Sequence, residues 1–241
     1  MKAVGLVTEY NPFHNGHIYH IEAAKAATGA DVVVAVMSGN FVQRGEPALI
    51  DKWHRAQLAL LHGVDLVIEL PTFFAVQPSH LFADGAIQLL TALNVKQVVF
   101  GSEHADVDFL SLAQQAPDVN QNDQFKQHNQ TFASVYAQQL SDKTGFELKE
   151  PNDILALGYA TAVLKQQSPI ELIPIQRVAA GYHELHFSET QEIASASAIR
   201  LALHKDRAEK IKNVVPNDVY QTLTSEASTI NFEEKFWPLL K

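Results

Sequence analysis

Cysteine is absent from the 241 residues of the chain. Its absence excludes disulfides, thiolate-ligated zinc and a cysteine nucleophile. Long apolar runs are absent too, since none approaches the ~18 residues that a membrane-spanning helix needs. The first residues, MKAVGLVTEYNP, turn polar too early for a signal peptide. We therefore expect a soluble, cytoplasmic protein with no membrane partner.

Basic residues are scarce. The chain has 18 Lys and Arg against 27 Asp and Glu, which gives a formal net charge of -9. A surface that binds nucleic acid broadly needs Lys and Arg to neutralise phosphates. The sequence therefore predicts no DNA partner, and we expect any RNA contact to be local or to use residues outside this chain.

Common motifs for phosphate binding and acyl transfer are missing as well. The sequence has no G-x-x-x-x-G-K-[ST] loop, no G-x-G-x-x-G after a strand and no G-x-S-x-G elbow. If the chain binds a nucleotide, another element must hold the phosphates. The stretch HNGH at residues 14–17 is the candidate.

What the sequence does contain is a regular alternation of elements, with 46% hydrophobic residues to fill a core. Apolar, β-branched runs predict buried parallel strands at 3–7, 31–37, 65–71 and 96–101. Amphipathic segments predict helices at 16–29, 51–63 and 80–93. This pattern predicts a doubly wound parallel α/β sheet, with ligands at the carboxyl ends of the strands.

The pattern changes after Glu103. Residues 104–168 have the pattern of a helical insertion with a polar loop, QNDQFKQHNQ, and a further strand is predicted at 170–177. A helix is then expected to start at SASAIR. We predict a catalytic domain over residues 1–190 and a helical C-terminal segment over 191–241 that we expect to be truncated.

The HNGH stretch follows the first predicted strand as a strand-to-helix turn. We expect Asn11 to cap the helix, Pro12 to lie in its first turn and the helix to run from about Phe13. His14 and His17 then share one face of the helix, because they are three residues apart. A helix N-terminus of this kind favours anions such as phosphate.

Other interpretations of these histidines remain open. One histidine could pack in the core while the other caps the helix. His14, His17 and His20 also follow a three-residue spacing that a zinc site could use. No carboxylate partner accompanies them, which makes zinc the less favoured interpretation.

A polar turn, Ser38 to Asn40, follows the second predicted strand. Gln43 and Arg44 come next and are expected to point into the crevice beside the first site. Arg44 could hold a phosphate or a small carboxylate in bidentate fashion, or it could be a surface residue of a loop. For Lys52 and Arg55, on the following helix, we favour a surface position.

Two further segments place polar residues at ends of elements. Gly101 ends a strand, where a glycine lets an adenine or ribose lie against the backbone, although a simple turn is the alternative. Asn152 and Asp153 stand at a helix start, and we expect at least one of them to be a cap.

The segment SASAIR lies late in the chain. Ser195 or Ser197 could cap a helix and bond a phosphate, and Arg200 follows on the same face one turn later. Such Ser and Arg spacings are common, so the segment gains weight only from its pairing with the early HNGH.

That pairing resembles the nucleotidyltransferase superfamily with HIGH and ISSTxxR-type motifs. Members adenylylate substrates with ATP and release pyrophosphate. More narrowly, five blocks between Gly5 and about Arg200 resemble the bacterial tRNA(Met) cytidine acetate ligase family: EYNPFHNGH, MSGNFVQRGEPA, ELPTFFAVQPSHLFADGA, FGSE and PNDILALGY. The resemblance implies a Rossmann-like sheet of the HIGH nucleotidyltransferase type.

It also implies an activity. ATP, with Mg²⁺, would activate acetate as acetyl-adenylate, and the acetyl group would pass to the wobble cytidine of elongator tRNA(Met). The family's helical C-terminal region helps to hold tRNA, and this chain is expected to lack much of that region.

The resemblance implies particular site residues. His14 and His17 would stabilise the α-phosphate and the leaving group, and Arg177 and Arg200 would neutralise β/γ charge. We predict His14, His17 and Arg200 as catalytic and infer an acetate site near Asn40 and Arg44. The predicted nucleotide-binding residues are Val7, Thr8, Glu9, Tyr10, Asn11, Pro12, Phe13, His14, Asn15, Gly16, His17, His20, Gly101, Asn152, Arg177, Ser197 and Arg200.

Two other functions remain open on the sequence alone. A small-metabolite adenylyltransferase, acting on a nucleotide or a pantetheine substrate, would share the H-x-G-H motif. A non-catalytic RNA-binding protein is the second alternative, although intact His14, Gly16, His17 and Arg200 argue against a decayed site.

Overall fold

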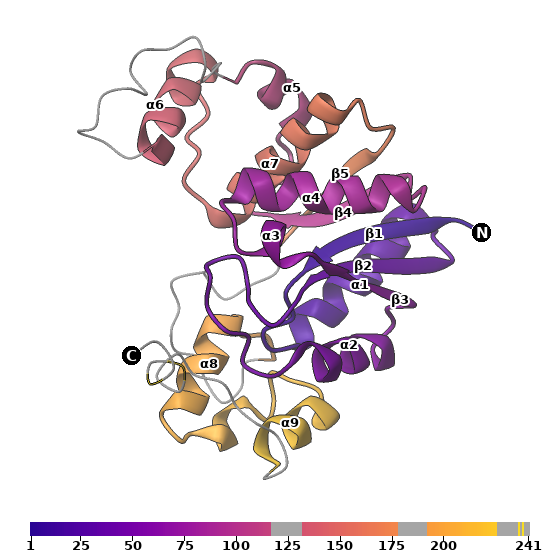
Figure 1. Cartoon of the computed structure of the whole chain (residues 1–241), viewed down its shortest axis with the longest axis vertical. Helices are drawn as coiled ribbons and strands as arrows, with labels where there is room; N and C mark the ends of the chain where they lie inside the picture. The colour runs from indigo at the N-terminus through magenta and orange to yellow at the C-terminus, as the bar shows by residue number, and fades with distance from the viewer. Residues whose placement is uncertain (117–131, 178–191, 226–235, 237, 239–241) are drawn as a thin grey trace.

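Alternating apolar segments of the chain form a five-stranded parallel sheet in the computed structural model, which describes residues 1–116, 132–177, 192–225, 236 and 238 (Figure 1). The strand order is β3-β2-β1-β4-β5. The strands are β1 (Ala3–Thr8), β2 (Val32–Ser38), β3 (Leu66–Leu70), β4 (Gln97–Ser102) and β5 (Glu171–Gln176). The predicted doubly wound parallel sheet is confirmed, with every strand within one residue of its predicted range.

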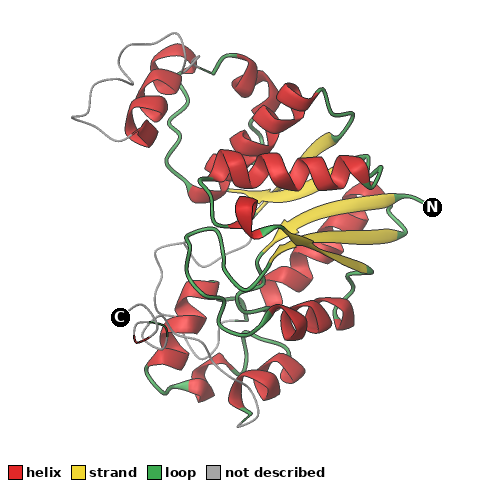
Figure 2. Ribbon diagram, viewed as in Figure 1, coloured by secondary structure: helices red, strands yellow, loops and turns green. Residues whose placement is uncertain are grey.

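Side chains of each strand alternate between two cores, one on each face of the sheet. In β2, Val33, Ala35 and Met37 point to one core and Val34 and Val36 to the other. Helices cover both faces, as Figure 2 shows. The first core is covered by α1 (Asn15–Thr28) and α2 (Lys52–Leu61), and the second by α4 (Ser79–Ala92), α5 (Phe109–Gln114) and α7 (Pro151–Gln166).

Two further helices precede α4 and α7. α3 (Thr72–Ala75) precedes α4, and α6 (Phe132–Thr144) precedes α7. The predicted helical character of residues 104–168 is confirmed where the structure describes them. The predicted loop QNDQFKQHNQ lies outside the described residues.

Residues 192–225 add α8 (Ala196–His204), the 3-10 helix η3 (Ala208–Ile211) and α9 (Asn217–Thr224). Ile199, Ile211 and Val219 are fully buried, and they belong to the same apolar core as α1 and α2. The predicted boundary at residue 190 lies outside the described residues, so the division into two domains stays a prediction. The apolar side chains that follow it share the core of the sheet.

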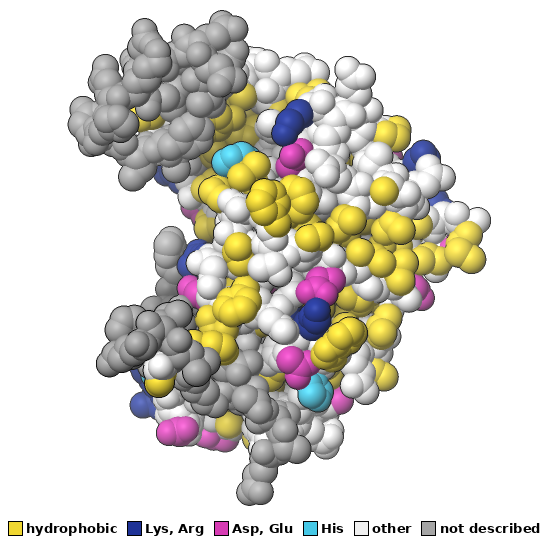
Figure 3. Space-filling model, viewed as in Figure 1, with side chains coloured by type: hydrophobic (Ala, Val, Ile, Leu, Met, Phe, Trp, Pro, Cys, Tyr) yellow, Lys and Arg dark blue, Asp and Glu magenta, His cyan; other side chains and the backbone are white. Residues whose placement is uncertain are grey.

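Surface properties agree with the composition. On the face shown in Figure 3, Lys and Arg are scattered, with Asp and Glu among them. Among the helices that the structure describes, none is both long enough and apolar enough to cross a membrane.

Ile199→Ala tests whether α8 and the sheet fold as one unit. Removing a fully buried side chain from the shared core leaves a cavity, so we expect the free energy of unfolding to fall by about 2–5 kcal/mol. Urea denaturation followed by circular dichroism measures it, with the exposed Lys205→Ala as control. We expect one cooperative unfolding transition in both proteins. Two transitions, of which only the earlier one shifts to lower urea concentration in Ile199→Ala, would contradict the shared core.

Candidate active site

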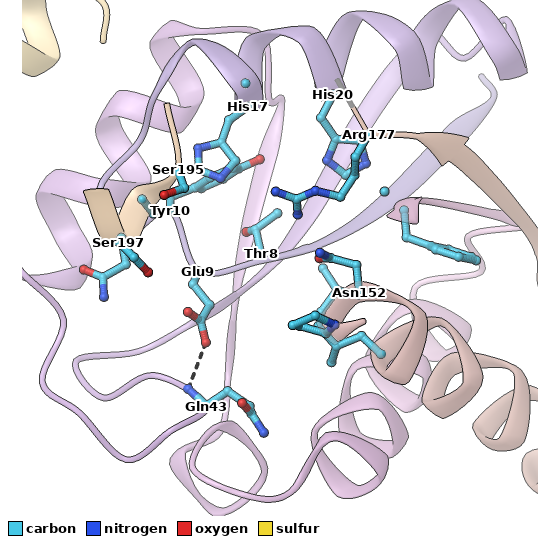
Figure 4. Close-up of a pocket in the computed structure, with 18 of the residues that line it drawn as sticks. Thr8, Glu9, Tyr10, His17, His20, Gln43, Asn152, Arg177, Ser195 and Ser197 are labelled. Atoms are coloured by element: carbon cyan, nitrogen blue, oxygen red, sulfur yellow. Dashed lines mark hydrogen bonds between the residues drawn. The ribbon is translucent and has the colours of Figure 1, made fainter. Parts of the chain in front are cut away.

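A cleft of about 530 Å³ opens at the carboxyl ends of β1, β4 and β5 (Figure 4). Its lining comes from the turn after β1, the loop after β2, the N-terminal parts of α4 and α7, and the start of α8. Parallel strands place their carboxyl ends at one edge of the sheet, which is why segments so distant in sequence meet there. Most of the predicted site residues line this cleft: Val7, Thr8, Glu9, Tyr10, Asn11, His14, Gly16, His17, His20, Arg44, Gly101, Asn152, Arg177, Ser197 and Arg200.

Four predicted residues do not line it. Phe13 is fully buried and stacks on the ring of His62, while Pro12 is buried beside it. The Asn15 side chain donates to the carbonyls of residues 192 and 213 at 2.8 and 3.0 Å. The carboxamide oxygen of Asn40 accepts from the backbone N–H of Lys52 at 3.0 Å. The two asparagine side chains thus bond backbone groups and do not face the cleft.

The turn into α1 differs from the prediction in its cap. The helix begins at Asn15 rather than Phe13, and His14 is the N-cap, since its backbone is extended and its Nδ1 accepts from the Gly16 N–H at 3.1 Å. Asn11 does not cap, because its side-chain oxygen accepts from the Leu49 N–H at 2.7 Å. Pro12 follows a cis peptide bond and precedes the helix. Cap rules favour Asn over His, so the sequence pointed to the wrong residue.

The two motif histidines stack, with ring centroids 3.8 Å apart. His17 Nδ1 accepts from the His14 N–H at 3.2 Å, and His14 Nδ1 accepts from Gly16. Each Nδ1 is thus an acceptor, which assigns the ring proton to Nε2 on both histidines. Both rings therefore keep an Nε2–H that can donate to a ligand in the cleft.

Burial keeps the histidines of this turn uncharged. Desolvation, with the nearby Arg177 charge, lowers the pKa of His14 to about 3. Desolvation also lowers the pKa of His17 well below its usual value, and that of His20 to about 4. At neutral pH all three rings are therefore uncharged. Among the residues that the structure describes, no group of three or more His, Cys, Asp or Glu is placed to hold a metal ion.

Several polar atoms of the cleft lack a partner. Thr8 Oγ1, Tyr10 OH and His20 Nε2 are buried without a hydrogen-bond partner in the described part of the chain. An unpaired buried polar group carries a desolvation cost that a bound ligand or water removes. Such a set is typical of a site that binds a polar molecule.

Cationic groups and a second helix end face the same space. Arg200 Nη1 donates to the Asn11 carbonyl at 2.7 Å, and Nη2 donates to Ser197 Oγ at 3.3 Å. Ser195 caps α8 by accepting from the Ala198 N–H at 3.1 Å, as predicted. Together with Arg177, these groups and the N-termini of α1 and α8 make the cleft suited to a polyanion.

Arg55 is not a surface residue, contrary to the prediction. Its side chain is fully buried and donates to the carbonyls of Glu9 (2.6 Å), Ser38 (3.1 Å) and Ile50 (3.1 Å), and also to that of Gly39. The ends of β1 and β2 and the following loop converge here with unpaired carbonyls, and a guanidinium supplies enough donors for all of them. Sequence reasoning could not see this convergence.

Asp153 is not a helix cap either, and neither is Asn152. The fully buried Asp153 carboxylate accepts from Ser102 Oγ at 2.6 Å, from the Glu103 N–H at 3.0 Å and from His104 Nδ1 at 2.6 Å. Asn152 donates to Glu103 at 2.5 Å. These bonds join the start of α7 to the end of β4, so that Gly101 and Asn152 line one wall of the cleft.

Sequence reasoning also missed an aromatic wall. Phe82 from α4, Phe100 from β4 and Tyr159 from α7 line the cleft and are almost fully buried. Their helical and strand periodicity is that of core residues, so no sequence signal separated them from the core.

Comparisons with known proteins agree with this geometry. The sequence matches the family described as HIGH Nucleotidyl Transferase over residues 1–241. It is 69% identical to tRNA(Met) cytidine acetate ligase of Leuconostoc mesenteroides and 70% identical to that of Leuconostoc citreum, over its full length. The chain spans 62% and 61% of the length of these curated relatives.

Solved structures give the same result. A crystal structure of apo Thermotoga maritima TmcAL matches with a TM-score of 0.82 and 38% identity, covering 92% of this chain and 56% of that one. A structure of the same protein bound with alpha-thio ATP matches with a TM-score of 0.79 and 38% identity, covering 92% of this chain and 55% of that one.

Arg55→Met removes the donor that serves four carbonyls. Since each buried carbonyl then lacks a partner, we expect the free energy of unfolding to fall by about 3–5 kcal/mol. Lys52→Met is the matched control, because Lys52 lies on the same helix with its charge at the surface and should change stability by less than about 1 kcal/mol. Urea denaturation measures both, and equal effects would contradict the structural role of Arg55.

His104→Gln tests the bond between His104 and Asp153. A hydrogen bond to that carboxylate raises the pKa of His104 in the folded state. The added stability is therefore fully present below the unfolded pKa of about 6.5 and is lost as the pH rises through the raised value. We expect the variant to lose more stability near pH 6 than near pH 9, as measured by urea denaturation at both; the same loss at both would argue against the pair.

Proposed function

Because the chain belongs to the HIGH nucleotidyl transferase family, we propose that it activates acetate with ATP and acetylates the wobble cytidine of elongator tRNA(Met). Family membership confirms the resemblance predicted from HNGH and SASAIR. The names of the curated relatives support the ligase chemistry, and the alpha-thio ATP complex of Thermotoga maritima TmcAL supports ATP as the nucleotide.

One observation carries the proposal. Two neutral histidines, each with a free Nε2–H, line the same cleft as the guanidinium groups of Arg177 and Arg200. An acetate oxygen attacks the α-phosphorus in line, and the bond to pyrophosphate breaks. His14 and His17 donate to oxygens on which negative charge grows, and the two arginines neutralise the leaving pyrophosphate.

Neutral donors suit this step for an electrostatic reason. A donor that is fixed in place and uncharged binds the ground state weakly but is already oriented for the charge that develops during the reaction. A lysine at the same position would bind ATP, acetate and products alike.

Mg²⁺ enters this proposal with the triphosphate. The described residues provide no three-ligand cluster, so we assign most of its coordination to phosphate oxygens and water, as is usual for Mg²⁺ with nucleotides. Mg²⁺ neutralises phosphate charge when bound. The residues of the chain orient the triphosphate around it.

RNA contact is proposed to be local. The net charge of -9 and the scattered basic side chains in Figure 3 do not favour broad binding of the phosphate backbone. We propose that this chain meets the acceptor cytidine at the cleft and that the protein acts in the cytoplasm.

Acetate-dependent exchange between ATP and labelled pyrophosphate tests the activation step. We expect exchange with acetate and none with nicotinamide mononucleotide. His17→Ala removes one positioned donor and should lower the exchange rate by about 10²–10³-fold. The exposed His54→Ala serves as the matched histidine control and should keep the rate.

Two outcomes would contradict the proposal. Exchange that requires nicotinamide mononucleotide and not acetate would favour the small-metabolite alternative. A His17→Ala variant with full exchange activity would remove this histidine from the mechanism.

A further inference from the structure

The activation step proposed above assigns no role to one part of the cleft, which includes Glu9, a residue predicted from the sequence to bind the nucleotide. Below Thr8 in the view of Figure 4, Glu9 and Gln43 border a space away from His17 and His20. The aromatic wall of Phe82, Phe100 and Tyr159 lines the same cleft. The activation step proposed above assigns none of these aromatic residues a role.

Glu9 is held by one hydrogen bond to its side chain and one to its backbone. Its Oε1 accepts from the Gln43 N–H at 2.9 Å, and the Gln43 side chain in turn donates to the Gln77 carbonyl at 2.9 Å. The Glu9 carbonyl accepts from the buried Arg55 at 2.6 Å. Within the described residues, Glu9 Oε2 has no hydrogen-bond partner. The carboxyl group is thus held in place with one oxygen left for a ligand.

The wall beside it is apolar, and the rings of Phe100 and Tyr159 are tilted by 52° to each other. Phe82, Phe100 and Tyr159 are 3%, 5% and 4% exposed, and the rings of Phe100 and Tyr159 lie 5.5 Å apart between centroids. Burial raises the pKa of the Tyr159 hydroxyl, and the Glu9 charge raises it further, so the hydroxyl stays neutral and close to Glu9. The small part of these rings that reaches the cleft is an apolar surface against which a nucleobase can pack.

We infer that this part of the cleft receives the cytosine ring of the acceptor nucleotide, with its exocyclic amine at Glu9 Oε2. A carboxylate accepts hydrogen bonds from the N4 amine of cytosine. Uracil presents a carbonyl oxygen at the same position, which a carboxylate repels. The inference rests on the proposed function and names the side chain that would select cytidine.

The contact between the N4 amine and Glu9 Oε2 also gives the proton lost in the transfer step an acceptor. The N4 nitrogen attacks the carbonyl carbon of acetyl-adenylate, and a C–N bond forms. The C–O bond to AMP breaks, and AMP leaves with the electron pair. The amine loses a proton, which Glu9 Oε2 accepts, so atoms and charge balance.

The surroundings of Glu9 suit a proton acceptor. Burial raises its pKa, which makes the carboxylate a stronger base than a solvated one. The Gln43 N–H and the charges of Arg200, Arg55 and Arg44 offset part of this rise and keep the ionised form accessible. Tyr159 faces the group from α7.

Binding of free cytidine and uridine tests the recognition. With an unreactive ATP analogue present, saturation-transfer NMR should show cytidine bound about tenfold more tightly than uridine, the effect of one charged hydrogen bond. Glu9→Gln should erase or reverse this preference, because its amide N–H donates to the uracil oxygen. Glu46→Gln is the matched control, since Glu46 lines the same cleft, and it should keep the preference.

Three results would overturn the inference: no detectable cytidine binding, equal affinities for the two nucleosides, or an unchanged preference in Glu9→Gln. Thermal denaturation of each variant confirms that the fold is kept.

A pH profile tests the proton step. The rate of acetyl transfer to cytidine should rise with pH as Glu9 ionises, and Glu9→Gln should lose that rise. Trapping of acetyl-adenylate with hydroxylamine monitors activation separately. Absence of the hydroxamate with the unaltered chain would contradict the proposed function. The preference for cytidine over uridine would still test the role of Glu9 independently. The same pH dependence in Glu9→Gln would exclude Glu9 as the proton acceptor.

Discussion

The buried guanidinium of Arg55 is the interaction on which the cleft depends. Two parallel strands end side by side, and their last carbonyls have no strand partner beyond that point. Arg55 fills this gap from α2 with hydrogen bonds to Glu9, Ser38, Gly39 and Ile50. A buried charge is costly, so the carbonyl dipoles and the charges of Glu9, Asp51 and Glu69 compensate it together. The result is a fixed junction between β1, β2 and the loop that borders the cleft.

The sequence predicted the framework well because the framework follows from hydrophobic patterning. Strands buried on both faces read as continuous apolar runs, and the helix predicted at 16–29 ends at Gly29 in the left-handed conformation that glycine favours. The local polar contacts were predicted poorly. Arg55 and Asp153 each bond atoms brought close by the fold, whereas helix periodicity and cap rules consider only neighbours in sequence. The bonds of His14 are local, but cap rules rank Asn above His and so favoured Asn11.

Within the candidate site, sequence motifs identified residues of the cleft but not their hydrogen bonds or protonation states. HNGH indicated a phosphate site, yet its spacing could not show that both Nδ1 atoms are used by the backbone. Nor could it show that burial keeps both rings neutral. Phe82 and Tyr159 have the periodicity of core residues, and only the three-dimensional structure places them at a cavity.

Two parts of the cleft have opposite electrostatic roles, and both lie near the end of β1. One part holds the neutral His14 and His17 together with Arg177 and Arg200, and it suits a group that gains negative charge. Glu9, the next residue in the chain, suits a group that gives up a proton. Thr8 is the last residue of β1 and Glu9 the first residue of the turn, and their side chains occupy different places in the cleft (Figure 4). Adjacent residues of β1 and its turn can therefore serve the activation of one substrate and the acceptance of a proton from another within one cleft.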